Sequence, residues 1–275
     1  MKPFPSARGR RILLEVCVAG IDDAIAARDG GADRLELNSA LALGGLTPSL
    51  GAMVEVSRAV DLPVLPMLRP RPGGFRYSER EHSVIEADAE ALLEAGAAGL
   101  VFGFLRDDGE IDVERCRRLR ERIPGERAAV FHRAFDVVPD PFEALEILVD
   151  LGFRRILTSG QAATALVGAG RLRALIERAR GRIEILPAAG IRPETIEALL
   201  EVVDCDQVHG SLRSIRFDRS TALRPEIRFG DESLPPEDRF DATDRDRVAA
   251  LRERLDRAEL GVEAEIPRQP PEIVQ

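Results

Sequence analysis

Lysine, cysteine and tryptophan are scarce in this chain. Lys2 is the only lysine among 275 residues, and there is no tryptophan. Chemistry that needs a Schiff-base lysine is therefore nearly excluded, which argues against lysine-dependent aldolases and pyridoxal phosphate enzymes. The three cysteines, Cys17, Cys116 and Cys205, are too few for a disulfide framework, and their odd number does not allow all of them to pair. We therefore expect a protein of the reducing cytoplasm.

The sequence also lacks long apolar runs and an excess of basic charge. No stretch approaches the roughly 20 apolar residues of a membrane helix, and the first residues show no secretion signal. Lysine and arginine total 39 against 48 acidic residues, which gives a formal net charge of −9 and argues against a nucleic-acid partner. Because 44% of the residues are hydrophobic, the chain can build a sizeable core.

Short apolar runs alternate with amphipathic segments along most of the chain. Eight runs have the length of buried parallel strands, at 13–17, 34–37, 64–68, 100–102, 129–132, 155–157, 183–186 and 207–209. Helical spacing marks 22–29, 79–95, 114–123, 141–151, 165–180 and 193–203. Eight such units predict an α/β fold, a closed TIM-type (β/α)8 barrel over residues 12–213. A doubly wound sheet is disfavoured because residues 18–22 lack a nucleotide-binding glycine fingerprint.

Residues 214–275 differ in composition and are rich in arginine, acidic residues and proline. We expect a C-terminal extension with a short strand at 227–229 and a helix at 244–260. Val248, Leu251 and Leu255 lie on one face of this helix, so the helix should dock on the barrel or on a second copy of the chain in a homodimer. The tail after Ile266 is expected to be disordered.

Polar side chains recur where the predicted strands end. In a TIM barrel these ends meet at one mouth, where water is available and active sites lie. The acid–base candidates at this mouth are Glu15, Glu36, His132, Asp136 and His209. The candidates for holding an anion are Arg34, Arg69, Arg71, Arg133, Ser159, Gly160, Gly190 and Ser211.

These charged residues also have a structural explanation. Glu15 or Glu36 paired with Arg34 or Arg69 would form an ionic network that fills the barrel. The two explanations stay open at this point. His82 lies on a predicted helix of mixed charge and is expected at the surface.

Several motifs together resemble the CutC copper homeostasis family. They lie at 15–18 (EVCV), 31–37 (GADRLEL), 44–49 (GGLTPS), 69–71 (RPR), 75–78 (FRYS), 131–136 (FHRAFD) and 157–160 (LTSG). The resemblance extends over roughly residues 13–214. It implies a TIM-type barrel and a cytoplasmic protein that binds copper.

The resemblance also implies a ligand. Cys17 matches a family cysteine proposed to bind copper, and copper(I) prefers thiolate and thioether ligands. At the position where a second cysteine is often found, this chain has Asn38, a poor ligand for copper(I). A pair of thiolates is therefore not expected here.

Two functions are open at this stage. The first is copper(I) binding and handling, with Cys17 as leading ligand and His132 or His209 as helpers. The second is an enzyme that acts on a small anionic metabolite, such as a phosphorylated sugar, by general acid–base chemistry at the barrel mouth. The expected partner is accordingly a copper ion or a small ligand.

Overall fold

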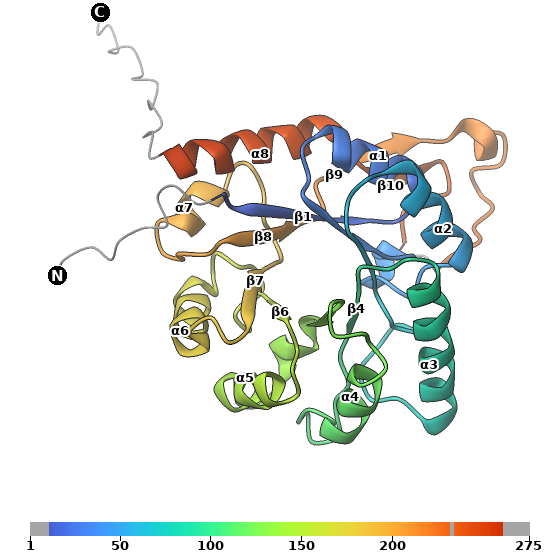
Figure 1. Cartoon of the computed structure of the whole chain (residues 1–275). Helices are drawn as coiled ribbons and strands as arrows, with labels where there is room; N and C mark the ends of the chain where they lie inside the picture. Colours follow the sequence, from blue (N-terminus) through green and yellow to red (C-terminus); the bar gives the residue numbers. More distant parts are fainter. Residues whose placement is uncertain (1–10, 232–233, 261–275) are drawn as a thin grey trace, which may run out of the picture.

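Strands and helices alternate through the computed structural model, which describes residues 11–231 and 234–260 (Figure 1). The barrel strands are β1 (Leu13–Val18), β2 (Arg34–Leu37), β3 (Val64–Pro66), β4 (Gly99–Phe102), β5 (Ala128–Phe131), β6 (Arg155–Thr158), β7 (Glu184–Pro187) and β8 (Gln207–Gly210). The helices around them are α1 (Ile21–Asp29), α2 (Leu50–Ala59), α3 (Glu79–Glu94), α4 (Val113–Arg120), α5 (Pro141–Asp150), α6 (Ala169–Ala179) and α7 (Ile196–Leu200).

The eight strands form the predicted (β/α)8 barrel, and every ladder between them is parallel. Hydrogen-bonded ladders join them in the orders β3-β2-β1-β8 and β4-β5-β6-β7. An isolated bridge between Met67 and Val101 connects β3 to β4. At the opposite junction, β7 and β8 are neighbours (Figure 1), but no backbone ladder joins them among the described residues. The barrel therefore has one seam without strand hydrogen bonds.

Local sequence signals determine where helices begin. Ser78 accepts a hydrogen bond from the backbone N–H of Glu81, whose carboxylate accepts one from the backbone N–H of Ser78, so a capping box starts α3. Helix α6 begins later than the sequence predicts, at Ala169, because the preceding loop folds back on itself. A Cβ at Gly168 would lie 1.9 Å from the carbonyl oxygen of Ser159, so this close approach requires glycine.

The barrel interior has an apolar half and a polar half. Strands β3 to β7 and their ends contribute a buried apolar cluster of Leu65, Met67, Val101, Val130, Leu157, Leu186 and Ala188. Strands β1, β2 and β8 instead alternate polar or ionisable side chains with apolar ones: Glu15, Cys17, Arg34, Glu36, Gln207 and His209. Because water does not reach most of these groups, each needs a partner inside the protein.

His82 is buried, so the expected surface position is wrong. Its imidazole lies 4.9 Å from the ring of Phe104 and 5.9 Å from the ring of Tyr77, both edge-on. The mixed charge of α3 belongs to its outer face, whereas His82 lies on the face that packs against the barrel.

The predicted C-terminal helix is present as α8 (Arg245–Leu260), and its predicted face is fully buried at Val248, Leu251 and Leu255. The helix packs against α1 and α7. Gly30 makes this packing close, since a Cβ there would lie 2.5 Å from the Cβ of Val248. The extension thus docks on the barrel of its own chain. The predicted disordered tail after Ile266 lies outside the described residues.

The strand predicted at 227–229 is absent. The extension instead contains an antiparallel pair, β9 (Arg213–Phe217) and β10 (Arg239–Thr243), which forms an arm. Apolar side chains alone suggested a strand at 227–229, but no neighbouring strand is available to pair with it in the described part of the extension.

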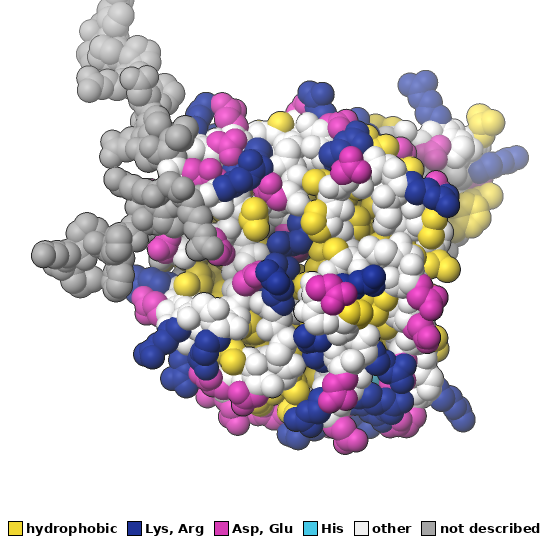
Figure 2. Space-filling model, viewed as in Figure 1, with side chains coloured by type: hydrophobic (Ala, Val, Ile, Leu, Met, Phe, Trp, Pro, Cys, Tyr) yellow, Lys and Arg dark blue, Asp and Glu magenta, His cyan; other side chains and the backbone are white. Residues whose placement is uncertain are grey.

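The arm exposes apolar side chains, as the outer edge of the molecule in Figure 2 shows. They are Ile215, Phe217, Leu223, Ile227, Phe229 and Phe240. Over the rest of that face, acidic and basic side chains are interspersed (Figure 2). None of the helices in the described ranges is both long and apolar enough to span a membrane.

Replacing Leu251 with alanine should lower the free energy of unfolding by about 2–5 kcal/mol, because it leaves a cavity between α8 and the barrel. Urea denaturation measures this change. The control is Glu253→Ala on the exposed side of the same helix, which should stay within about 0.5 kcal/mol. A Leu251→Ala variant as stable as the parent would contradict the docking of α8.

Candidate functional site

A cavity of about 510 Å³ opens at the C-terminal ends of the barrel strands. Its walls come from the ends of β1, β2, β3, β5, β6, β7 and β8 and from several of the loops that follow them. Of the site residues predicted from the sequence, the cavity is lined by Cys17, Glu36, Arg69, His132, Arg133, Asp136, Gly190, His209 and Ser211. Closure of the barrel therefore brings together side chains that are far apart in the sequence.

Cys17, Glu36 and His209 form a compact group on one side of this cavity. Cys17 and Glu36 are direct neighbours in the ladder between β1 and β2. One potential ligand atom from each of the three residues lies within 4.8 Å of the others. The Asn38 amide donates hydrogen bonds to Glu36 Oε1 at 2.8 Å and to Cys17 Sγ at 3.3 Å. Glu36 Oε2 has no hydrogen-bond partner among the described residues.

The protonation states of this group depend on one another. Burial raises the pKa of the Cys17 thiol and of the Glu36 carboxyl, because it disfavours the charged form of each group. Burial by itself would lower the pKa of His209, but the carboxyl groups of Glu36 and Glu15 outweigh it and raise this pKa well above its ordinary value. His209 is thus held as the cation between two acids.

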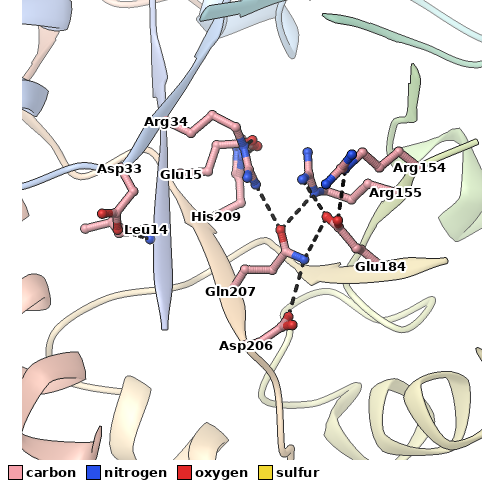
Figure 3. Close-up of polar contacts among 10 residues, drawn as sticks. All are labelled: Leu14, Glu15, Asp33, Arg34, Arg154, Arg155, Glu184, Asp206, Gln207 and His209. Carbon is pink, nitrogen blue, oxygen red and sulfur yellow. Dashed lines mark hydrogen bonds and ion pairs between the residues drawn. The ribbon is translucent and has the colours of Figure 1, made fainter. Parts of the chain in front are cut away.

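Beneath the cavity, an ionic network crosses the inside of the barrel (Figure 3). Glu15 bonds to His209 Nδ1 at 2.8 Å through one oxygen and to Arg34 Nε through the other. Burial opposes ionisation of Glu15, yet Arg34 and His209 together hold its pKa well below its usual range. Arg34 and Arg155 both donate to the side-chain oxygen of Gln207, at 2.9 and 2.8 Å.

The network continues to β7. Arg155 Nη2 lies 2.5 Å from Glu184 Oε2, and the Gln207 amide donates to the same oxygen at 3.2 Å. The structural explanation considered for Glu15 and Arg34 therefore holds for both, and neither lines the cavity. Arg155, Glu184 and Gln207 were missed as site residues. The available signal was a polar residue at the start of each of the three last barrel strands.

Asp136 holds the loop after β6 in place through hydrogen bonds. Its carboxylate accepts hydrogen bonds from Thr158 Oγ1, from Ser159 and Gln161 backbone N–H groups, and from Arg133 Nε at 2.8 Å. Ser159 is fully buried beside it. This arrangement positions the loop and leaves Asp136 with few free acceptor sites for acid–base work.

Two further anion candidates lie outside the cavity. Gly160 turns against Gly168 in the same loop, where its φ of +71° requires glycine. Arg71 pairs with Glu81 at 2.5 Å, and its guanidinium covers the ring of Tyr77 at 5.1 Å. The structure thus does not bring Arg71, Ser159 and Gly160 to the cavity with the other candidates.

Arg69, after β3, and His132, after β5, also line the cavity. His132 Nδ1 accepts a hydrogen bond from the backbone N–H of Ala134 at 3.2 Å, so the proton of the neutral ring is on Nε2. Arg69 donates to the carbonyl oxygens of Leu43, Gly45 and Gly73 at 2.8–3.1 Å and thereby holds the loops after β2 and β3.

A sequence profile described as the CutC family matches residues 12–214 of this chain. The chain belongs to the CutC family. A CutC family protein of Treponema denticola is 44% identical over 242 residues, which cover 88% of this chain and 98% of that protein. The human copper homeostasis protein cutC homolog is 47% identical over 204 residues, 74% of each chain.

A solved structure of a CutC protein from Streptococcus agalactiae has a TM-score of 0.69 and 33% identity, and covers 73% of this chain and 98% of that chain. Phosphoribosylanthranilate isomerase from Thermotoga maritima, at 15% identity and a TM-score of 0.52, shares the barrel fold alone and covers 89% of this chain and 98% of that one. The TIM-type barrel and the CutC membership expected from the motifs are both confirmed.

Acid unfolding tests the burial of a neutral His132. Burial and the nearby Arg69 lower the pKa of His132 to about 3, from an ordinary value of 6.5. Between these two pH values the unfolded chain binds a proton that the folded chain does not. Stability should therefore fall as pH falls through this window, with a contribution of about 1.4 kcal/mol per pH unit.

A His132→Asn variant keeps an acceptor for the Ala134 N–H but does not titrate, so it should lose this part of the slope. The measurement is the unfolding free energy as a function of pH between neutral and mildly acidic conditions. Equal slopes for the variant and the parent would refute a buried neutral imidazole at this position.

Proposed function

We propose that this CutC family member binds copper(I) at Cys17 and His209, with Glu36 beside them. The observation that carries the proposal is the grouping of a thiol, an imidazole and a carboxyl within 4.8 Å on the wall of one cavity. The names of the human and mouse relatives, which describe copper homeostasis, support copper as the ion.

The donor set fits copper(I) through its softer members. A thiolate from Cys17 is a preferred ligand, imidazole suits copper as well, and the thioether of Met67 lines the same cavity. Glu15 is hydrogen-bonded to Nδ1 of His209, so Nε2 is the nitrogen available to an ion. The same hydrogen bond fixes the orientation of the imidazole ring. Glu36 Oε2, which has no hydrogen-bond partner among the described residues, is a further oxygen ligand atom beside Cys17 and His209.

Asn38 supports this ligand set without joining it. Its amide N–H groups hold Glu36 and Cys17 in place from the position where the family often has a cysteine. Copper has to displace a proton from the Cys17 thiol and from His209, since the pKa of each is raised in the folded protein.

Anaerobic titration against a copper(I)-specific chelator tests the proposal. The protein should take up one copper(I) ion, and Cys17→Ser should weaken the affinity by at least about 100-fold, because it removes the thiolate ligand. Cys205→Ser is the matched control, since this buried cysteine lies away from the cavity and its loss should leave uptake unchanged. Absence of uptake by the parent, or equal uptake by Cys17→Ser, would overturn the copper site.

The cytoplasmic location remains part of the proposal and is supported by the three cysteines, all of which are free thiols. The homodimer stays a prediction, as does the acid–base enzyme, because no contact among the described residues identifies a reaction. The apolar side chains exposed on the arm are compatible with self-association.

A further inference from the structure

The cavity is much larger than a metal ion requires. Its volume of about 510 Å³ falls among the pockets that hold small molecules, about 300–1,000 Å³. The copper ligands proposed above occupy only the side formed by β1, β2 and β8. On the other side the wall combines polar groups with apolar ones such as Phe75 and Leu157.

The cavity is cationic although the protein as a whole carries a net charge of −9. Four arginines and the cationic His209 line it, against two carboxyl groups, those of Glu36 and Asp136, while the His132 ring is neutral. Asp136 is already paired with Arg133. The excess of positive charge in a concave site attracts anions and raises their local concentration.

Arg69 is a buried cation without a counter-ion. Its residue is 8% exposed, and the guanidinium contacts backbone carbonyl oxygens and the face of Phe75 at 5.4 Å. No carboxylate forms an ion pair with it within residues 11–231 and 234–260, and its Nε has no hydrogen-bond partner there. Desolvating a charge without neutralising it is costly, so an anion bound beside Arg69 would offset this cost.

His132 presents a second unused donor on the same wall. The residue is 3% exposed, and its Nε2 has no partner among the residues that the structure describes. The imidazole lies 4.9 Å from the ring of Phe75, which the Arg69 guanidinium also contacts. The side chains of Arg69 and His132 thus both lie against Phe75. Each has one N–H donor without a partner among the described residues, and both residues line the cavity.

The loop after β7 adds a further cation to the lining of the cavity. Arg192 lines the cavity, is exposed, and its side chain has no partner in the described part of the chain. Gly190, two residues before Arg192, also lines the cavity, and its φ of +71° favours glycine. In many TIM barrels the loops after the seventh and eighth strands bind phosphate.

We propose that the cavity binds a small organic oxyanion, a carboxylate or a phosphate ester, independently of copper. The anionic group accepts hydrogen bonds from Arg69 Nε and His132 Nε2, and Arg192 adds charge at the rim. The rest of the molecule packs on Phe75 and the neighbouring apolar wall.

Calorimetric titration of the copper-free, full-length protein at low ionic strength tests this site. Inorganic phosphate and malonate are the two probes, and they separate phosphate esters from carboxylates as the favoured class. Saturable binding of either probe at one equivalent, with a melting temperature that rises with its concentration, is the expected result. Absence of saturable binding of both probes up to about 10 mM would overturn the proposal.

Variants then locate the binding. Arg192→Ala and His132→Asn should each weaken the affinity for the better probe by about tenfold or more. His132→Gln, whose amide N–H reaches towards the Nε2 position, should recover part of that loss. Arg80→Ala on α3 is the control, since this exposed arginine is remote from the cavity and should bind like the parent.

Affinity in Arg192→Ala and His132→Asn equal to that of the parent would place the anion elsewhere and overturn the site. Because no copper is present in these titrations, their failure leaves the copper proposal intact. In the same way, a protein that takes up no copper(I) still tests the anion site.

Discussion

The carboxylate of Glu15 is the interaction on which the site depends. It lies inside the barrel, where it pairs with both Arg34 and His209. Its hydrogen bond to Nδ1 orients the His209 imidazole beside Cys17, and together with Glu36 it favours the cationic form of that ring. Removing one member of such a buried network leaves an uncompensated charge, which costs about 3–5 kcal/mol.

The same network spans the seam of the barrel. Since β7 and β8 share no backbone ladder in the described ranges, contacts between side chains hold this junction together (Figure 3). Gln207 on β8 bonds to Glu184 on β7, and Arg155 on β6 bonds to both. Gln207 is suited to its place because its oxygen accepts from two arginines while its amide donates to a carboxylate. Charge balance and barrel closure are thus provided by one set of residues.

The division of the interior into an apolar and a polar half explains where chemistry is available. On the side of β1, β2 and β8, ionisable groups stand close enough to share protons or an ion. Near Phe75, Arg69 and His132 have donors that the described residues leave unused. The proposed metal ion and the proposed oxyanion contact different residues of one cavity, so each proposal can be tested without the other.

By itself, the sequence determined the eight strand–helix units, the buried face of α8 and the set of polar residues at strand ends, because periodicity and turn residues are local properties. It also carried the motifs of the CutC family. The tertiary structure decided which charges meet. Arg34 and Arg71 turn to Glu15 and Glu81, whereas Arg192, unremarkable in the sequence, reaches the cavity. The choice of partner depends on strand register and barrel closure, which bring together residues almost two hundred positions apart, such as Glu15 and His209.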